Sequence, residues 1–164
     1  MIAFDNLKIA VIGLGYVGLP LAVEFGRKFP VIGFDVDATR IYELEQGIDR
    51  TKTLAQGALE SANPIRFTSD ESDLSCCNCY IITVPTPIDK FNRPDLRSLK
   101  LASETVGRVL CKGDFVIFES TVYPGCTEDE CIPTIESMSQ LTLNEDFFCG
   151  YSPERVNPGD PERS

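Results

Sequence analysis

Residues 7–27 read LKIAVIGLGYVGLPLAVEFGR, and this stretch decides the fold. The apolar run at residues 7–12 predicts a buried strand of a parallel sheet. A glycine-rich turn follows the run, and residues 17–27 then have the apolar spacing of a helix. Pro20 falls in the first turn of that helix, where a missing amide hydrogen costs little. The stretch therefore predicts a strand, a tight turn and a helix in direct succession.

The same alternation of strand and helix continues along the chain. Further apolar runs predict strands at residues 31–36, 65–68, 80–84, 115–119 and 147–151. Helices are predicted at 37–46 and 95–110, with Asp37 and Asp95 as caps, and also at 53–63 and 127–138. Strands that are apolar throughout are typical of a parallel sheet covered on both faces. The pattern predicts one α/β domain, a Rossmann-type doubly wound parallel sheet with helices on both faces.

Composition excludes several classes of partner. Fifteen Lys and Arg stand against twenty-five Asp and Glu, and the net charge of -10 repels nucleic-acid phosphates. No apolar run approaches the roughly 20 residues that span a bilayer, so we expect no membrane partner and a cytoplasmic location. The chain has seven cysteines and no histidine, and the cysteine spacing lacks the paired pattern of zinc sites. We therefore expect free thiols and no metal.

The glycine-rich turn predicts a nucleotide site. Residues 13–18, GLGYVG, match the G-x-G-x-x-G motif between a strand and a helix. In this motif Gly13 permits the tight turn, Gly15 lets a diphosphate approach the backbone, and Gly18 lets the helix pack closely on the strand. Tyr16 and Val17 complete the turn and belong to the predicted cofactor site. The alternative is a glycine-rich turn that binds no ligand.

Asp35 indicates which dinucleotide the site takes. It lies 22 residues after Gly13, near the end of the second expected strand. A carboxylate at this place can accept hydrogen bonds from the adenosine ribose and repels a 2'-phosphate, which favours NAD over NADP. Arg40, one helical turn further on, is predicted to contact the ribose or adenine side. Alternatively, Asp35 caps the next helix, although Asp37 can fill that role.

Four segments together resemble one family, the UDP-glucose/GDP-mannose dehydrogenases. They are GYVGLP at 15–20, TVPTP at 83–87, ESTVYPG at 119–125 and YSPER at 151–155. Their order and spacing extend the resemblance over the whole chain. Within the family, residues 84–89, 123–128 and 153–160 are most similar to the enzymes acting on UDP-N-acetylglucosamine or UDP-N-acetylgalactosamine, including the Vi-polysaccharide type.

The resemblance implies an NAD-dependent oxidoreductase. Such an enzyme converts the C6 hydroxyl of a UDP-N-acetylhexosamine into the carboxylate of a uronic acid, a precursor of polysaccharides. The oxidation removes four electrons and passes through an aldehyde held on a cysteine as a thiohemiacetal. Two alternatives stay open at this point: a UDP-glucose 6-dehydrogenase, and a non-catalytic module that binds or senses NAD.

The resemblance also implies roles for three residues beyond the glycine-rich turn. Thr86 and Thr121 follow the fourth and fifth expected strands, where ligands bind in open parallel sheets, so both are expected at the cofactor. Glu154 is expected to act as the acid/base that handles water, with Thr121 positioning that water. The alternative for Glu154 is a surface carboxylate paired with Arg155.

The domain organisation expected from the resemblance is larger than this chain. Residues 1–164 correspond to the N-terminal NAD-binding domain, and the chain is expected to be truncated before a central helical region and a C-terminal UDP-sugar-binding domain. The catalytic cysteine and an essential lysine belong to those absent parts. The isolated chain is therefore expected to be inactive. The full-length protein is expected to bind the UDP-sugar mostly through those parts and to form a homodimer.

Overall fold

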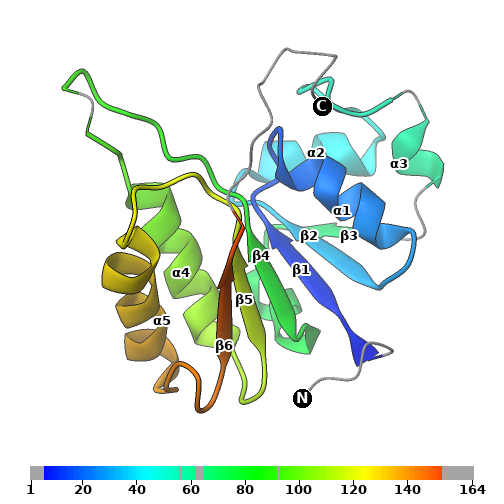
Figure 1. The fold of residues 1–164 in the computed structure, drawn as a ribbon. Helices are drawn as coiled ribbons and strands as arrows, with labels where there is room; N and C mark the ends of the chain where they lie inside the picture. The colour runs from blue at the N-terminus through cyan, green and yellow to red at the C-terminus, as the bar shows by residue number, and fades with distance from the viewer. Residues whose placement is uncertain (1–5, 56, 62–64, 92, 153–164) are drawn as a thin grey trace.

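The computed structural model describes residues 6–55, 57–61, 65–91 and 93–152. The strands among these residues form one parallel sheet (Figure 1). Its strands lie in the order β3-β2-β1-β4-β5-β6, and every neighbouring pair is parallel. The strands are β1 (Ile9–Ile12), β2 (Val31–Phe34), β3 (Arg66–Thr68), β4 (Cys79–Ile82), β5 (Phe115–Phe118) and β6 (Phe148–Tyr151). The order reverses between β1 and β4, which opens a crevice at their carboxyl ends. This confirms the Rossmann-type fold.

Helices cover both faces of the sheet (Figure 1). They are α1 (Gly18–Gly26), α2 (Ala38–Glu45), α3 (Ala58–Ser61), α4 (Arg97–Val109) and α5 (Ile132–Ser139). Helices α1 and α2 pack on one face, whereas α4 and α5 pack on the other. Within the described residues, no helix is both long and apolar enough to cross a membrane.

Two separate cores result, one on each face of the sheet. In β1, Ile9 and Val11 join the core under α1 and α2, whereas Ala10 and Ile12 join the core under α4 and α5. All four side chains are at most 2% exposed. Because successive strand residues point to opposite faces and both faces are covered, the central strands must be apolar throughout. This is the physical origin of the apolar runs in the sequence.

The predicted helix ends needed correction in three places. Only Ala58–Ser61 is helical within the stretch predicted at 53–63, among the residues that are described there. The helix predicted at 127–138 begins as a π-helical turn, Thr127–Cys131, before α5. The N-cap of α4 is Leu96 instead of Asp95, although the Asp95 carboxylate still accepts the Arg97 N–H at 3.1 Å.

A short 3-10 helix, Glu71–Cys76, was not predicted from the sequence. It begins after Asp70, whose carboxylate accepts the N–H of Ser72 at 2.9 Å. Such a side-chain-to-backbone bond competes with longer regular structure and leaves little periodicity to detect.

Candidate cofactor site

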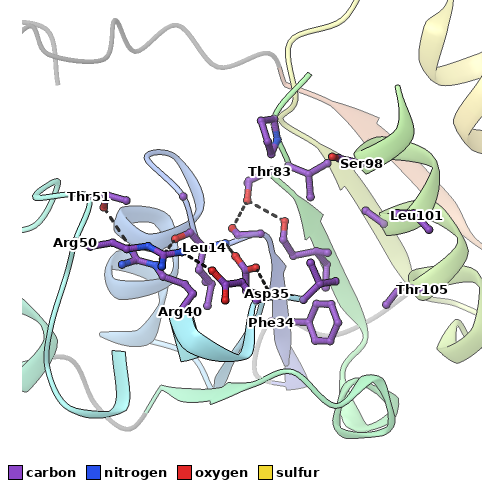
Figure 2. Close-up of a pocket in the computed structure, with 18 residues that line it drawn as sticks. Leu14, Phe34, Asp35, Arg40, Arg50, Thr51, Thr83, Ser98, Leu101 and Thr105 are labelled. Carbon is purple, nitrogen blue, oxygen red and sulfur yellow. Dashed lines mark hydrogen bonds and ion pairs between the residues drawn. The ribbon is translucent and has the colours of Figure 1, made fainter. Parts of the chain in front are cut away.

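A cavity of about 350 Å³ opens at the carboxyl ends of β1, β2 and β4 (Figure 2). Its walls come from the loops that follow these strands, residues 13–15, 35–37 and 83–85, and from Ser98, Leu101, Ala102 and Thr105 of α4. In Figure 2, Asp35 lies between the α4 wall and a second wall that contains Arg40, Arg50 and Thr51. The cavity therefore sits where the strand order reverses, the place at which open α/β sheets bind ligands.

The glycines of the turn fit the presence of a ligand. Gly13 has φ of +94°, a left-handed conformation that favours glycine. A Cβ atom on Gly18 would overlap the carbonyl oxygen of Gly13 and the hydroxyl of Thr83, so the start of α1 can pack this closely only without a side chain. A Cβ atom on Gly15 would meet no atom within 4 Å. Gly18 thus packs as predicted, and open space lies in front of Gly15, where a diphosphate can approach the backbone.

Thr83 ties the two central strands together at the mouth of the cavity. Its hydroxyl is placed to donate to the carbonyl oxygen of Ile12 at 3.0 Å or of Gly13 at 2.7 Å. Thr83 is 8% exposed, so these bonds lie in a protected place. We did not predict Thr83 as a site residue. The sequence pattern that could have indicated it is a hydroxyl side chain directly after an apolar strand, next to the crevice.

Asp35 points into the cavity from the end of β2 (Figure 2). Its Oδ2 accepts the N–H of Leu14 at 2.8 Å, and its Oδ1 accepts the N–H of Asp37 at 3.0 Å. Each carboxylate oxygen has a further lone pair, so both can still accept from ribose hydroxyls. The cap of α2 is Asp37, whose Oδ1 accepts the N–H of Thr39 at 3.0 Å. Asp35 is therefore not the cap, and its contact with the ribose stays a prediction.

Arg40 is 2% exposed and links two loops of the site. Its Nε donates to the carbonyl oxygen of Leu14 at 3.0 Å, and its Nη2 donates to Asp49 Oδ1 at 2.9 Å. Its Nη1 is buried without a hydrogen-bond partner, and the side chain lines the cavity. Arg40 thus fixes the glycine-rich turn, while its predicted contact with the cofactor stays a prediction.

Asp49 is the anion that makes this burial of Arg40 tolerable. Its two oxygens accept from the backbone N–H groups of Thr51, Thr53 and Leu54 as well as from Arg40. Burial raises the pKa of this carboxyl, but the hydrogen bonds from Thr51, Arg40 and Thr53 outweigh that effect and hold the pKa well below its usual range. The sequence signal was an Asp followed at short range by two threonines, a pattern typical of a turn.

Four further predicted site residues, Tyr16, Val17, Thr86 and Thr121, do not line this cavity. Thr86 Oγ1 donates to the carbonyl oxygen of Thr121 at 2.5 Å, so the loops after β4 and β5 contact each other. Tyr16 is exposed, and Val17 is the N-cap residue of α1. Glu154 lies outside the described residues. The structure thus brings Thr86 and Thr121 together, and their contact with a cofactor stays a prediction.

The cysteines are all free thiols, and none lines the cavity. Burial raises the pKa of Cys79 to about 11 and that of Cys131 to about 12. A protonated thiol is a poor nucleophile, so these two are unsuited to covalent catalysis at neutral pH. Within the described part of the chain, no group of three or more acidic or cysteine side chains is arranged to hold a metal ion.

Fold and site together define a dinucleotide-binding domain of the dehydrogenase class. Residues 7–163 match the UDP-glucose/GDP-mannose dehydrogenase family, NAD binding domain. The chain belongs to this family, and NAD is its cofactor.

Three relatives show how far the similarity extends. The chain is 59% identical over 157 residues to UDP-N-acetyl-D-glucosamine 6-dehydrogenase of Pseudomonas aeruginosa, which covers 96% of the chain and 37% of the relative. It is 57% identical over 160 residues to the protein of the same name in Salmonella typhi, and this match covers 98% of the chain and 38% of the relative. A solved structure of UDP-D-ManNAc dehydrogenase from Pyrococcus horikoshii superposes with a TM-score of 0.83 at 34% identity. This match covers 93% of the chain and 37% of the solved structure. The chain therefore spans less than two-fifths of the length of these relatives.

Two glycine substitutions should separate folding from ligand binding. We expect Gly18→Ala to lower the free energy of unfolding by about 1–3 kcal/mol, because its methyl group overlaps Gly13 and Thr83. Gly15→Ala, the matched control, should leave stability nearly unchanged because its methyl group enters open space. The same methyl group should weaken NAD binding at least about tenfold, or 1.4 kcal/mol. Urea unfolding and titration calorimetry measure the two effects, and equal NAD affinity of Gly15→Ala and wild type would contradict the placement of the diphosphate.

A second prediction concerns the buried pair of Arg40 and Asp49. Asp49→Asn should lower the free energy of unfolding at neutral pH by about 3–5 kcal/mol, because it leaves the Arg40 charge without an anion. The folded-state pKa of Asp49 lies below the ordinary value of 3.8, so its contribution is complete above that pH and is lost as the pH falls toward the folded-state pKa. The difference between wild type and variant should therefore shrink on acidification below about pH 4. Urea unfolding of both proteins over this range measures it, and a difference that stays constant would argue against the role of Asp49.

Proposed function

We propose that this chain supplies the NAD site of an enzyme that oxidises the C6 hydroxyl of a UDP-N-acetylhexosamine to the carboxylate of a uronic acid. The observation that carries the proposal is the 59% identity, over 96% of the chain, to a UDP-N-acetyl-D-glucosamine 6-dehydrogenase. Identity to the UDP-D-ManNAc dehydrogenase is only 34%, which favours UDP-N-acetylglucosamine over UDP-N-acetylmannosamine within this class of substrate. The cavity at the carboxyl ends of β1 and β4 supports the cofactor part of the proposal.

The residues of the cavity suggest which part of NAD each would hold. Asp35 would accept hydrogen bonds from the adenosine ribose, and the open space in front of Gly15 would receive the diphosphate. The start of α1 favours that negative charge through its unpaired N–H groups and its dipole. Leu101 and Ala102 offer apolar surface for the adenine ring. When bound, NAD supplies the acceptor for a hydride.

The chemistry would need groups that the described residues do not offer. Thr121 lies at the carboxyl end of β5, where it would position water together with Glu154. None of the seven cysteines lines the cavity, and burial keeps Cys79 and Cys131 protonated at neutral pH, which speaks against a nucleophile from these positions. The proposal therefore assigns the nucleophilic cysteine and the lysine to the remaining length that the relatives possess. A homodimer in the cytoplasm is part of the same proposal.

Substitution of Asp35 tests the ribose contact. Asp35→Ala should weaken NAD binding by about 1–3 kcal/mol, the scale of a lost hydrogen bond to a charged group. Asp35→Asn is the control for the turn, because its remaining oxygen can still accept the N–H of Leu14. Titration calorimetry with NAD and NADP measures both variants. Unchanged NAD affinity in Asp35→Ala, or equal affinity of the wild type for NADP, would remove Asp35 from the ribose role.

The isolated chain should bind NAD but should not form NADH with a UDP-sugar. Without a nucleophile and a wall that orients the sugar, about 7–11 kcal/mol of barrier lowering from orientation is lost. NADH absorbance with UDP-N-acetylglucosamine, UDP-N-acetylgalactosamine and UDP-glucose measures this. A protein extended to the length of the relatives should form NADH fastest with a UDP-N-acetylhexosamine. Sustained turnover by the isolated chain would contradict the assignment of the catalytic groups. If the extended protein oxidises UDP-glucose fastest, the result favours UDP-glucose as the substrate. If the extended protein is inactive, the result favours an NAD-sensing module.

A further inference from the structure

A second arginine, Arg50, lines the cavity together with Asp35 and Asp37, at the side where the ribose is proposed to bind. Figure 2 shows Arg50 on the wall that also contains Arg40 and Thr51. Its Nη2 lies 2.5 Å from Asp37 Oδ2. Its Nη1 lies 3.4 Å from Glu43 Oε2, an ion pair without a hydrogen bond. Two carboxylates therefore hold this guanidinium.

The charges around this corner sum to a negative value. Arg40 is neutralised by Asp49, which leaves Asp35, Asp37 and Glu43 around the single charge of Arg50. The hydrogen bond from Arg50 holds the pKa of Asp37 below its usual range, so Asp37 is charged at neutral pH. An arriving phosphate would thus meet more anions than cations.

We propose that Asp37 and Glu43 exclude NADP by holding Arg50 in ion pairs, so that its guanidinium is withheld from a 2'-phosphate on the adenosine ribose. Arginine is a strong phosphate ligand because its planar group donates two parallel hydrogen bonds. Here a phosphate would compete with two carboxylates for the Arg50 guanidinium, because Nη2 already donates to Asp37 and Nη1 is paired with Glu43. The phosphate would also meet the Asp35 carboxylate in the same cavity. Selectivity of this kind acts through charges set against the wrong ligand. The inference rests on the placement of the ribose at Asp35 proposed above.

The ion pair of Arg50 with Asp37 contributes little to the stability of the fold. The side chains of Arg50 and Asp37 are 46% and 43% exposed, and ion pairs at such exposure contribute little to the stability of a fold. Asp37 also caps α2, but a cap needs only an acceptor oxygen, which asparagine provides equally well. The charge of Asp37 is thus separable from its capping role.

The test uses variants that remove charge and keep shape. Asp37→Asn, Glu43→Gln and the double variant release Arg50 while the cap of α2 is retained. Titration calorimetry of the chain with NAD and with NADP gives the ratio of the two affinities. In the double variant we expect the affinity for NADP relative to NAD to rise at least about tenfold, the scale of a close charge pair. Adding Arg50→Gln to the double variant should abolish most of this gain.

Two results would overturn the inference alone: an unchanged ratio of NADP to NAD affinity in the double variant, or a gain that persists in full when Arg50 is replaced. Both apply when NAD binding of the wild type depends on Asp35. If NAD binds independently of Asp35, the ribose placement fails, and the inference fails with it. If Asp37→Asn does not fold, Glu43→Gln alone should still raise the ratio of NADP to NAD affinity, by a smaller factor. An unchanged ratio in Glu43→Gln would then overturn the inference.

Discussion

The close approach of helix α1 to the ends of β1 and β4 is the constraint on which the site depends. The backbone at Gly18 comes so near to the Gly13 carbonyl oxygen and the Thr83 hydroxyl that no side chain fits between them. This contact directs the start of α1 at the cavity, where its unpaired N–H groups favour an anion. A Cβ atom on Gly15, three residues earlier, would meet no atom within 4 Å. The turn thus combines a tightly packed glycine with one that faces room for a diphosphate.

A buried charge pair holds the second wall of the cavity in place. Arg40 connects the Leu14 carbonyl oxygen in the turn to Asp49 in the loop after α2. Asp49 in turn organises the backbone from Thr51 to Leu54. Because a buried arginine is tolerated only with a hydrogen-bonded anion, the two loops depend on each other. The position of Arg50 next to the cavity follows from the position of this loop.

The sequence predicted the parallel sheet, the glycine-rich turn and the place of Asp35, because each depends on local pattern or on the order of elements. The role of Arg40 could be predicted only in part. Its spacing from Asp35 placed Arg40 in the first turn of α2, near the cavity. The contact with Asp49, however, depends on how the loop after α2 folds back, and hydrophobic periodicity does not reveal that. Thr83 was missed for a similar reason, since its partners Ile12 and Gly13 are distant in sequence. The short α3 shows that helical pattern alone does not fix where a helix begins and ends.

The cavity lies across the junction of β1 and β4, and this has a mechanical consequence. Residues 13–15 and Asp35 come from one half of the sheet, whereas residues 83–85 and Leu101 come from the other. Anything that fills the cavity touches both halves and resists their separation. A ligand that binds only the folded state adds RT ln(1 + [L]/Kd) to the free energy of unfolding. The cofactor would then act as a brace across the middle of the sheet, and the resistance of the domain to unfolding would follow the cellular supply of NAD.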